Sequence, residues 1–314
     1  MKNDLKQRWA TEPAKAFIES LCRLAHSGNG YELKETPFGT VQGTERLDFR
    51  GIVFPDRTEL RRVTVSNADF SSARIKLGRL TLCSFVNVCF DQSLMQNLYE
   101  YGNDFKECSF RETNLGDAIL GYHGSRYTSC YFEATHFRKA GFIRAEFDDC
   151  LFDDCTFGKV DFSSSSFERC VFRGQVRDVW FRGTYPVSET LEQFANPRPN
   201  LMSHVSFKDA QLLDVTFSDH CDLSTVIPPS DGRQAVFDCW PERIRLVFEQ
   251  SRSWAEPCRK EGGIFLQIFE GHAKKQDWYL IGVDALVNLF GVECGTKIWE
   301  ALIATKIERL TPLN

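Results

Sequence analysis

Large apolar side chains recur at every fifth position through the middle of this chain. One position of the series is polar, at Glu100, and the series then continues to Leu120. A seven-residue step leads from Leu120 to Tyr127, where the five-residue period resumes. Its apolar members are Leu60, Val65, Phe70, Ile75, Leu80, Phe85, Phe90, Met95, Phe105, Phe110, Leu115, Leu120, Tyr127, Phe132, Phe137, Phe142, Phe147, Phe152, Phe157, Phe162, Phe167, Phe172, Phe207, Leu212 and Phe217. A fixed short period over so long a stretch indicates a repeat architecture, in which each repeat contributes the same buried position.

A small residue lies two positions before most of these large ones, as Cys150 does before Phe152. Side chains two positions apart point to the same side of an extended chain, so both would face inward. The three other positions of each repeat are mostly polar, which suits exposure to water. An α-helix cannot hold this pattern, because a step of five residues turns it by about 500° and moves each phenylalanine to another face. The pattern therefore predicts a mainly β solenoid.

These repeats resemble the pentapeptide-repeat family, whose motif is a small residue, then Asp or Asn, then a central Leu or Phe, then two polar residues. Matching segments are ADFSS from Ala68, TNLGD from Thr113, AEFDD from Ala145, CLFDD from Cys150 and VDFSS from Val160. The resemblance implies a right-handed quadrilateral β-helix, in which each pentapeptide forms one side of a square coil. Residues twenty apart would stack at about 4.8 Å. Cys130, Cys150 and Cys170 would then form a column of buried, reduced thiols.

The pattern divides the chain into three parts. We expect residues 1–44 to form an N-terminal helical cap, residues 45–228 the β-helix, and residues 229–314 an α-helical C-terminal domain. A solenoid needs caps because its open ends expose unpaired backbone and apolar side chains. The apolar stripe of the first cap consists of Phe17, Ile18, Leu21 and Leu24. The C-terminal domain would serve either as the second cap or as a docking unit, and the latter role includes a homodimer.

The five-residue series stops between Phe172 and Phe207, where its expected positions cannot form continuous rungs. We expect an insertion of loop and short helix at about residues 173–204. Its aromatic residues are Trp180, Phe181, Tyr185 and Phe194. They would either pack the insertion onto the rod or bind a partner. Smaller irregularities at residues 98–104 and 121–126 are expected to bulge outward.

Charge and composition narrow the classes of partner. The formal net charge of -5 provides no basic surface for phosphates, so direct nucleic-acid binding is not expected. The first residues lack the apolar stretch of a signal peptide, and the apolar segment 278–304 carries too many charges to span a bilayer. The 12 cysteines include no CxxC pair, and a chain of this size needs no disulfide framework. We therefore expect reduced cysteines and a cytoplasmic protein.

Residue patterns for catalysis or for a cofactor are missing from the sequence. The six histidines are scattered, and the run from Asp219 to Asp222 holds Asp, His and Cys on adjacent residues. Adjacent side chains of an extended segment point in different directions, so this run does not predict a zinc site. Nucleophile elbows, phosphate-binding loops and dinucleotide fingerprints do not occur. The sequence predicts no enzymatic activity, no cofactor and no metal.

The most organised polar feature is a group of carboxylates that we call the acidic corner, since the repeat places it on two consecutive sides of one coil. Its members are Glu146, Asp148, Asp149, Asp153 and Asp154. Such a group could imitate the phosphates of duplex DNA. Basic residues such as Arg138, Arg144 and Arg169 are interspersed, however, which favours an ordinary mixed surface.

Two main functions follow. The first is a non-enzymatic protein-interaction scaffold of bacterial type, with a protein partner that the sequence does not name. The second is a DNA-mimicking protector or inhibitor of a type II topoisomerase, DNA gyrase or topoisomerase IV, in drug or toxin resistance. The resemblance to quinolone-resistance members of the family suggests this alternative. In a third reading, the C-terminal domain carries an effector activity.

Overall fold

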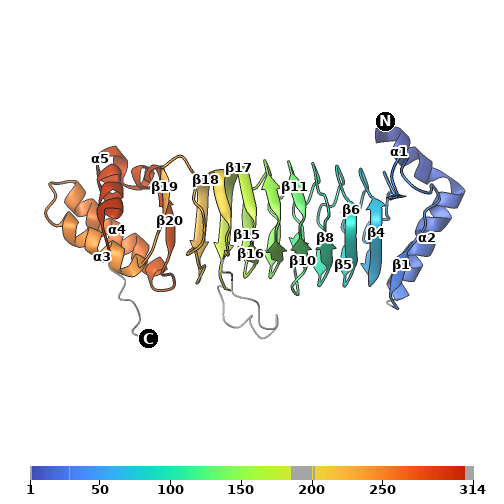
Figure 1. Ribbon diagram of the computed structural model, residues 1–314, viewed down its shortest axis with the longest axis horizontal. Coiled ribbons are helices and arrows are strands. Elements are labelled where there is room, and N and C mark those ends of the chain that lie inside the picture. The colour runs from blue at the N-terminus through green and yellow to red at the C-terminus, as the bar shows by residue number, and fades with distance from the viewer. Residues whose placement is uncertain (1, 28, 185–199, 201, 308–314) are drawn as a thin grey trace.

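The computed structural model describes residues 2–27, 29–184, 200 and 202–307, and shows a straight rod of stacked strands with helices at both ends (Figure 1). The N-terminal helices and first strands are α1 (Lys2–Gln7), η1 (Arg8–Ala10), α2 (Glu12–Ser27), β1 (Tyr31–Leu33), β2 (Leu47–Asp48), β3 (Glu59–Arg61), β4 (Val63–Asp69), β5 (Arg79–Thr81), β6 (Ser84–Cys89), β7 (Tyr99–Tyr101), β8 (Asp104–Lys106) and β9 (Ile119–Leu120). The later elements are β10 (Arg126–Thr128), β11 (Tyr131–Glu133), β12 (Gly141–Ile143), β13 (Glu146–Asp148), β14 (Leu151–Asp153), β15 (Val160–Ser163), β16 (Ser166–Glu168), β17 (Val171–Arg182), β18 (Ser206–Ser218), β19 (Gln234–Phe237), α3 (Trp240–Ser251), α4 (Cys258–Ala273), β20 (Tyr279–Gly282) and α5 (Val283–Ala304).

The rod is a β-solenoid with four sides to each coil, as predicted. Parallel strands of successive coils pair residues twenty apart, such as Phe147 with Phe167 and Phe132 with Phe152. In both pairs the ring centroids lie 4.9 Å apart, so the phenylalanines stack as continuous columns inside the rod. We number the four sides of the rod and call the inward residue of each repeat a rung. The rungs of side 1 are Val65, Phe85, Phe105, Tyr127, Phe147 and Phe167, and those of side 2 are Phe49, Phe70, Phe90, Phe110, Phe132, Phe152, Phe172 and Phe207. The rungs of side 3 are Phe54, Ile75, Met95, Leu115, Phe137 and Phe157, and those of side 4 are Leu60, Leu80, Glu100, Leu120, Phe142, Phe162, Phe181 and Phe217.

The rod continues regularly past the point where the sequence pattern placed an insertion. Strand β17 pairs along most of its length with β18, and Val176 and Phe181 are fully buried. The step from Phe172 to the next rung, Val176, is four residues instead of five. The rungs that follow are therefore Val176 and Phe181, one position before Arg177 and Arg182, which the five-residue period predicted. The expectation of an insertion from residue 173 is therefore wrong for residues 173–182, which form part of the β-helix.

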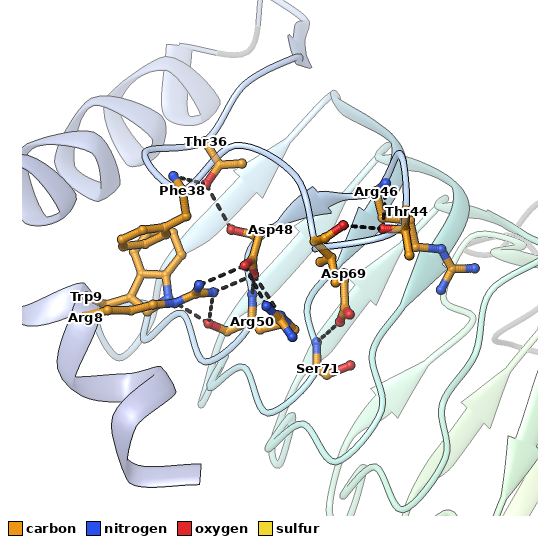
Figure 2. Close-up of polar contacts among 11 residues, drawn as sticks. Arg8, Trp9, Thr36, Phe38, Thr44, Arg46, Asp48, Arg50, Asp69 and Ser71 are labelled. Atoms are coloured by element: carbon orange, nitrogen blue, oxygen red, sulfur yellow. Dashed lines mark hydrogen bonds and ion pairs between the residues drawn. The ribbon is translucent and has the colours of Figure 1, made fainter. Parts of the chain in front are cut away.

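The N-terminal helices close one end of the rod through a buried ion pair (Figure 2). The guanidinium groups of Arg8 and Arg50 both donate to the Asp48 carboxylate, whose side chain is only 6% exposed. The indole of Trp9 donates to Arg50 O over 2.9 Å. Within α2, Ile18 and Leu21 are buried as predicted, but Leu24 is 43% exposed and does not belong to the buried stripe.

The C-terminal part closes the other end with glutamine side chains that pair with the backbone of the last coil. Gln276 Nε2 donates to Phe217 O over 3.0 Å, and Gln276 Oε1 accepts from the amide of Cys221 over 3.1 Å. Gln234 Nε2 donates to Leu212 O over 2.9 Å. This part also contains the antiparallel pair β19 and β20, which the sequence pattern did not predict. Helices α3, α4 and α5 enclose a separate apolar core, and no described helix is long and apolar enough to cross a membrane.

Ten cysteines are free thiols, and the three predicted to stack inside the rod, Cys130, Cys150 and Cys170, are buried. The expectation that all cysteines are reduced is wrong at one place, because Cys258 and Cys294 form a disulfide between α4 and α5. The two residues are 36 positions apart, so their pairing depends on how the two helices pack. Sequence spacing alone gives no sign of such a contact.

Candidate functional site

The acidic corner lies on sides 1 and 2, as the repeat predicted, but basic side chains of neighbouring coils pair with much of it. Arg126 Nε lies 3.1 Å from a Glu146 oxygen, and Arg169 forms an ion pair with Asp148. Asp153 lies 3.9 Å from the guanidinium of Arg173 in the next coil. These arginines compensate the charge of three of the five carboxylates.

Asp149 and Asp154, the remaining carboxylates of the acidic corner, occupy the turns between sides. Both have the positive φ that recurs at the corners of this rod, at 54° and 47°. The Ser129 hydroxyl lies 3.1 Å from Asp149 Oδ2. Because these exposed carboxylates are bordered by arginine-paired ones, the corner presents a mixed surface rather than a continuous negative strip.

The aromatic residues assigned to the insertion separate into different environments. Phe181 is fully buried on side 4, where its ring lies 5.1 Å from that of Phe162 and 5.0 Å from that of Phe217. As a core rung it cannot contact a partner, so its assignment as a partner-binding residue is wrong. Trp180 is half-buried at the adjacent outward position of β17. Tyr185, Phe194 and the expected short helix near Thr190 lie outside the described residues.

The polar residue that interrupts the five-residue series, Glu100, occupies a rung of side 4. It is buried between Leu80 and Leu120 in the column, so residues 98–104 do not bulge as expected. Its carboxylate accepts hydrogen bonds from the Tyr127 hydroxyl at 2.5 Å and from the Gly121 amide at 3.4 Å. Burial raises the pKa of Glu100 to about 7, although both hydrogen bonds act in the opposite direction.

The seven-residue step forms a tight bulge at residues 121–125, directly beside Glu100. Gly121 has a φ of 77°, and a Cβ there would lie 2.5 Å from the Cβ of Ala145, so this position requires glycine. The bulge carries two rings outward onto strand β7. The ring of His123 stacks on that of Tyr101 at 4.2 Å, and the Tyr122 ring lies 5.7 Å from the same tyrosine.

Together these features form a groove on the outer surface of side 4, which we call the tyrosine groove. Its volume is about 670 Å³. It is lined by Glu59, Arg61, Arg79, Thr81, Leu82, Tyr99, Glu100, Tyr101, Ile119, Tyr122 and Ile143. Outward positions of a solvated rod are normally polar, yet Tyr99 is 47% exposed and Leu82 is 42% exposed here. An exposed apolar surface with an aromatic side chain suits a binding partner.

Sequence reasoning missed this groove although both of its signals were visible. The polar interruption at Glu100 and the extra residues after Leu120 were read as separate irregularities. Glu100 and the extra residues after Leu120 are one coil apart in the chain, and the register of side 4 places them next to each other. The aromatic residues at outward positions, Tyr99 and Tyr101, depart from the polar pattern of the other repeats. The described residues contain no cluster of three or more potential metal ligands.

The repeat and the register decide which fold this is, since each coil has four sides and most sides are five residues long. The chain has the four-sided β-solenoid fold of pentapeptide-repeat proteins. Neither a protein-family model nor a curated protein sequence matches it.

Solved pentapeptide-repeat proteins are similar to this one over most of their own length. One is QnrB1, a plasmid-mediated fluoroquinolone resistance protein, at 13% identity and a TM-score of 0.24, with 60% of this chain and 88% of that chain covered. Another is HetL, a pentapeptide repeat protein involved in heterocyst differentiation regulation from the cyanobacterium Nostoc, at 12% identity and a TM-score of 0.19, with 67% and 96% covered. Because both TM-scores are below 0.5, the assignment of the fold rests on the repeat and its register and not on these similarities.

Proposed function

We propose that this protein belongs to the pentapeptide-repeat family and is a non-enzymatic scaffold that binds a protein partner through the tyrosine groove. The observation that supports this proposal is the apolar surface of side 4, built from the exposed Tyr99 and Leu82 and the partly buried Tyr101. Tyrosine contributes large, rigid contact area at low entropic cost, and is enriched in protein interfaces. The stacked columns beneath the groove hold its strands in fixed positions, which favours binding without rearrangement.

The acidic corner supports a DNA-mimicking inhibitor of a topoisomerase less well. Mimicry of duplex DNA requires a dense series of uncompensated negative charges. Here Arg126, Arg169 and Arg173 pair with carboxylates of the corner. We therefore place the partner at the tyrosine groove.

Site-specific crosslinking in the native host tests this proposal. A photo-reactive amino acid replaces Leu82 at the groove, which is 42% exposed. The matched control replaces Leu94 on side 3, which is 40% exposed. A third variant carries the probe at Asp154 in the acidic corner.

We expect a specific protein adduct from the Leu82 position, absent from the Leu94 position. The double substitution Tyr99→Ser and Tyr101→Ser should remove the adduct without changing the thermal unfolding midpoint by more than a few degrees. Adducts that form equally at Leu82 and Leu94, or only at Asp154, would contradict the groove as the interface.

A further inference from the structure

The tyrosine groove has chemically distinct ends. It crosses five coils along the rod axis, on strands β3, β5, β7, β9 and β12. Arg61 and Arg79 line the end nearest the N-terminal cap, where Glu59 is the neighbouring acidic residue. Tyr99 and Tyr101 line the middle, and Ile119 and Ile143 line the far end. A ligand that fits along it needs a charged part followed by an apolar part.

The two arginines at the N-terminal end of the groove differ from the arginines that neutralise the acidic corner. Arg126 and Arg173 pair with carboxylates of adjacent coils. Among the described residues, neither Arg61 nor Arg79 makes a side-chain ion pair or hydrogen bond with a carboxylate. Their guanidinium groups are exposed, so they can form bidentate hydrogen bonds with an incoming carboxylate.

The length of the groove sets the size of its occupant. The five strands are separated by four intervals of about 4.8 Å, so the groove spans roughly 19 Å. This length corresponds to about six residues of extended peptide. Two exposed arginines are few for a nucleic acid, whose binding depends on many phosphate contacts. Isoleucine side chains at the far end also favour aliphatic or aromatic residues over sugar and phosphate.

We infer that the tyrosine groove binds an acidic-apolar peptide segment of the partner. Two carboxylates of the segment contact Arg61 and Arg79, and its apolar side chains lie against Tyr99, Tyr101 and Ile119. This inference rests on the proposed function and specifies the chemistry that the partner must present. The segment would be an extended stretch of about six residues, with its acidic residues at one end.

Defined peptides test the inference by fluorescence anisotropy with the full chain. The probe is fluorescein-labelled Asp-Asp-Gly-Phe-Leu-Leu, made in both chain directions. In one comparison peptide both Asp residues are replaced by Lys, and in another each residue of Phe-Leu-Leu is replaced by Ser. We expect the acidic-apolar probe to bind with a Kd on the order of 10⁻⁵ M and each comparison peptide at least ~10-fold more weakly.

Protein variants assign the contacts. The double substitution Arg61→Glu and Arg79→Glu should weaken binding of the acidic-apolar probe at least ~10-fold, and Tyr99→Ser by a similar factor. Lys208→Glu is the control: this exposed cation follows the rung Phe207 on side 2, as Arg61 follows Leu60, and its reversal should change the Kd less than ~2-fold. Circular dichroism should show the same thermal midpoint for all of these variants.

Several outcomes would overturn the inference. They are equal binding of the Lys peptide, unchanged affinity in the arginine variant, no binding of the probe at millimolar concentration, or tighter binding of an oligothymidylate. The crosslinking experiment separates these from failure of the proposed function. A partner that crosslinks at Leu82 through a basic or neutral segment would retain the scaffold and reject the acidic peptide.

Discussion

Tyr127 on side 1 and Glu100 on side 4 are joined by a buried hydrogen bond between different coils, in which the tyrosine hydroxyl donates to Glu100 Oε2. Both side chains occupy rungs that are otherwise filled by apolar residues. Burial raises the pKa of Tyr127 well above its ordinary value, and it raises the pKa of Glu100 to about 7. The pair therefore places a titratable group inside the core, directly beneath the tyrosine groove.

This position predicts a pH-dependent stability. The pKa of Glu100 is raised from 4.5 to about 7 on folding, so its protonated form stabilises the fold fully below pH ~4.5. That contribution, on the order of 3 kcal/mol, is lost as the pH rises through about 7. The isosteric variant Glu100→Gln should lack this dependence, and it should be more stable than the wild type at pH 8. Denaturant unfolding at pH 5 to 8 measures the difference.

The control for this experiment is Asp104→Asn, which changes an exposed carboxyl on the neighbouring strand β8. Its stability should follow the wild-type profile across the same pH range. Parallel profiles for the wild type and Glu100→Gln would show that the Glu100 carboxyl does not titrate in this range.

The buried ion pair at the N-terminal cap predicts the opposite pH response. Burial opposes ionisation of Asp48, but hydrogen bonds from Arg8 and Arg50 outweigh it and hold its pKa well below the usual 3.8. This contribution is present above pH ~4 and is lost as the pH falls below that value. Asp48→Asn should cost about 3 kcal/mol, because it leaves the two guanidinium groups without their shared partner.

Hydrogen exchange of the amides in α2 should detect this loss as faster exchange at neutral pH. Asp56→Asn serves as the control, since it removes an exposed ion pair with Arg74 and should cost less than about 1 kcal/mol. Equal protection of α2 in both variants would contradict the role of Asp48 in holding the cap.

The stacked columns predict a large penalty for removing one ring. Phe152 is fully buried between Phe132 and Phe172, with ring centroids 4.9 and 4.6 Å away. Strands held in ladders cannot collapse into the space, so Phe152→Ala should cost roughly 3 to 5 kcal/mol. Leu151→Ala, one position away and facing outward, should cost about 1 kcal/mol. Urea unfolding that gives similar midpoints for both variants would reject the column as core.

The disulfide predicts both a thiol count and a stability change. Unfolded protein without reductant should take up ten alkyl groups, and twelve after reduction. Closing a loop of 36 residues contributes about 4 kcal/mol in a chain-entropy treatment, so reduction should destabilise the helical core. A variant with Cys258→Ala and Cys294→Ala should not respond to reductant. Twelve alkyl groups without reduction would show that the bond does not form.

The rod could be predicted from the sequence because most repeats show the same pattern, a small and a large inward residue two positions apart. Each repeat adds to the evidence for the fold, and the stacked coils bury these residues in the same columns. The sequence pattern did not predict β17, because the four-residue step to Val176 shifts the phase of the repeat. A constant period of five residues then predicts Arg177 as the inward residue. The small residues Gly174 and Val179, two positions before Val176 and Phe181, carried the corrected phase. It missed the Cys258–Cys294 pair and the tyrosine groove because both depend on neighbours that only the folded register brings together.

The bulge after Leu120 shows how this architecture tolerates change. Leu120 pairs with Phe142 of the next coil although the two residues are 22 positions apart, two more than in a regular coil. Extra residues at a corner are thus absorbed on the outside, while the columns of rings remain in phase. Insertions at single corners could therefore change the shape of the outer surface of the rod during evolution and leave the packing of its interior unchanged.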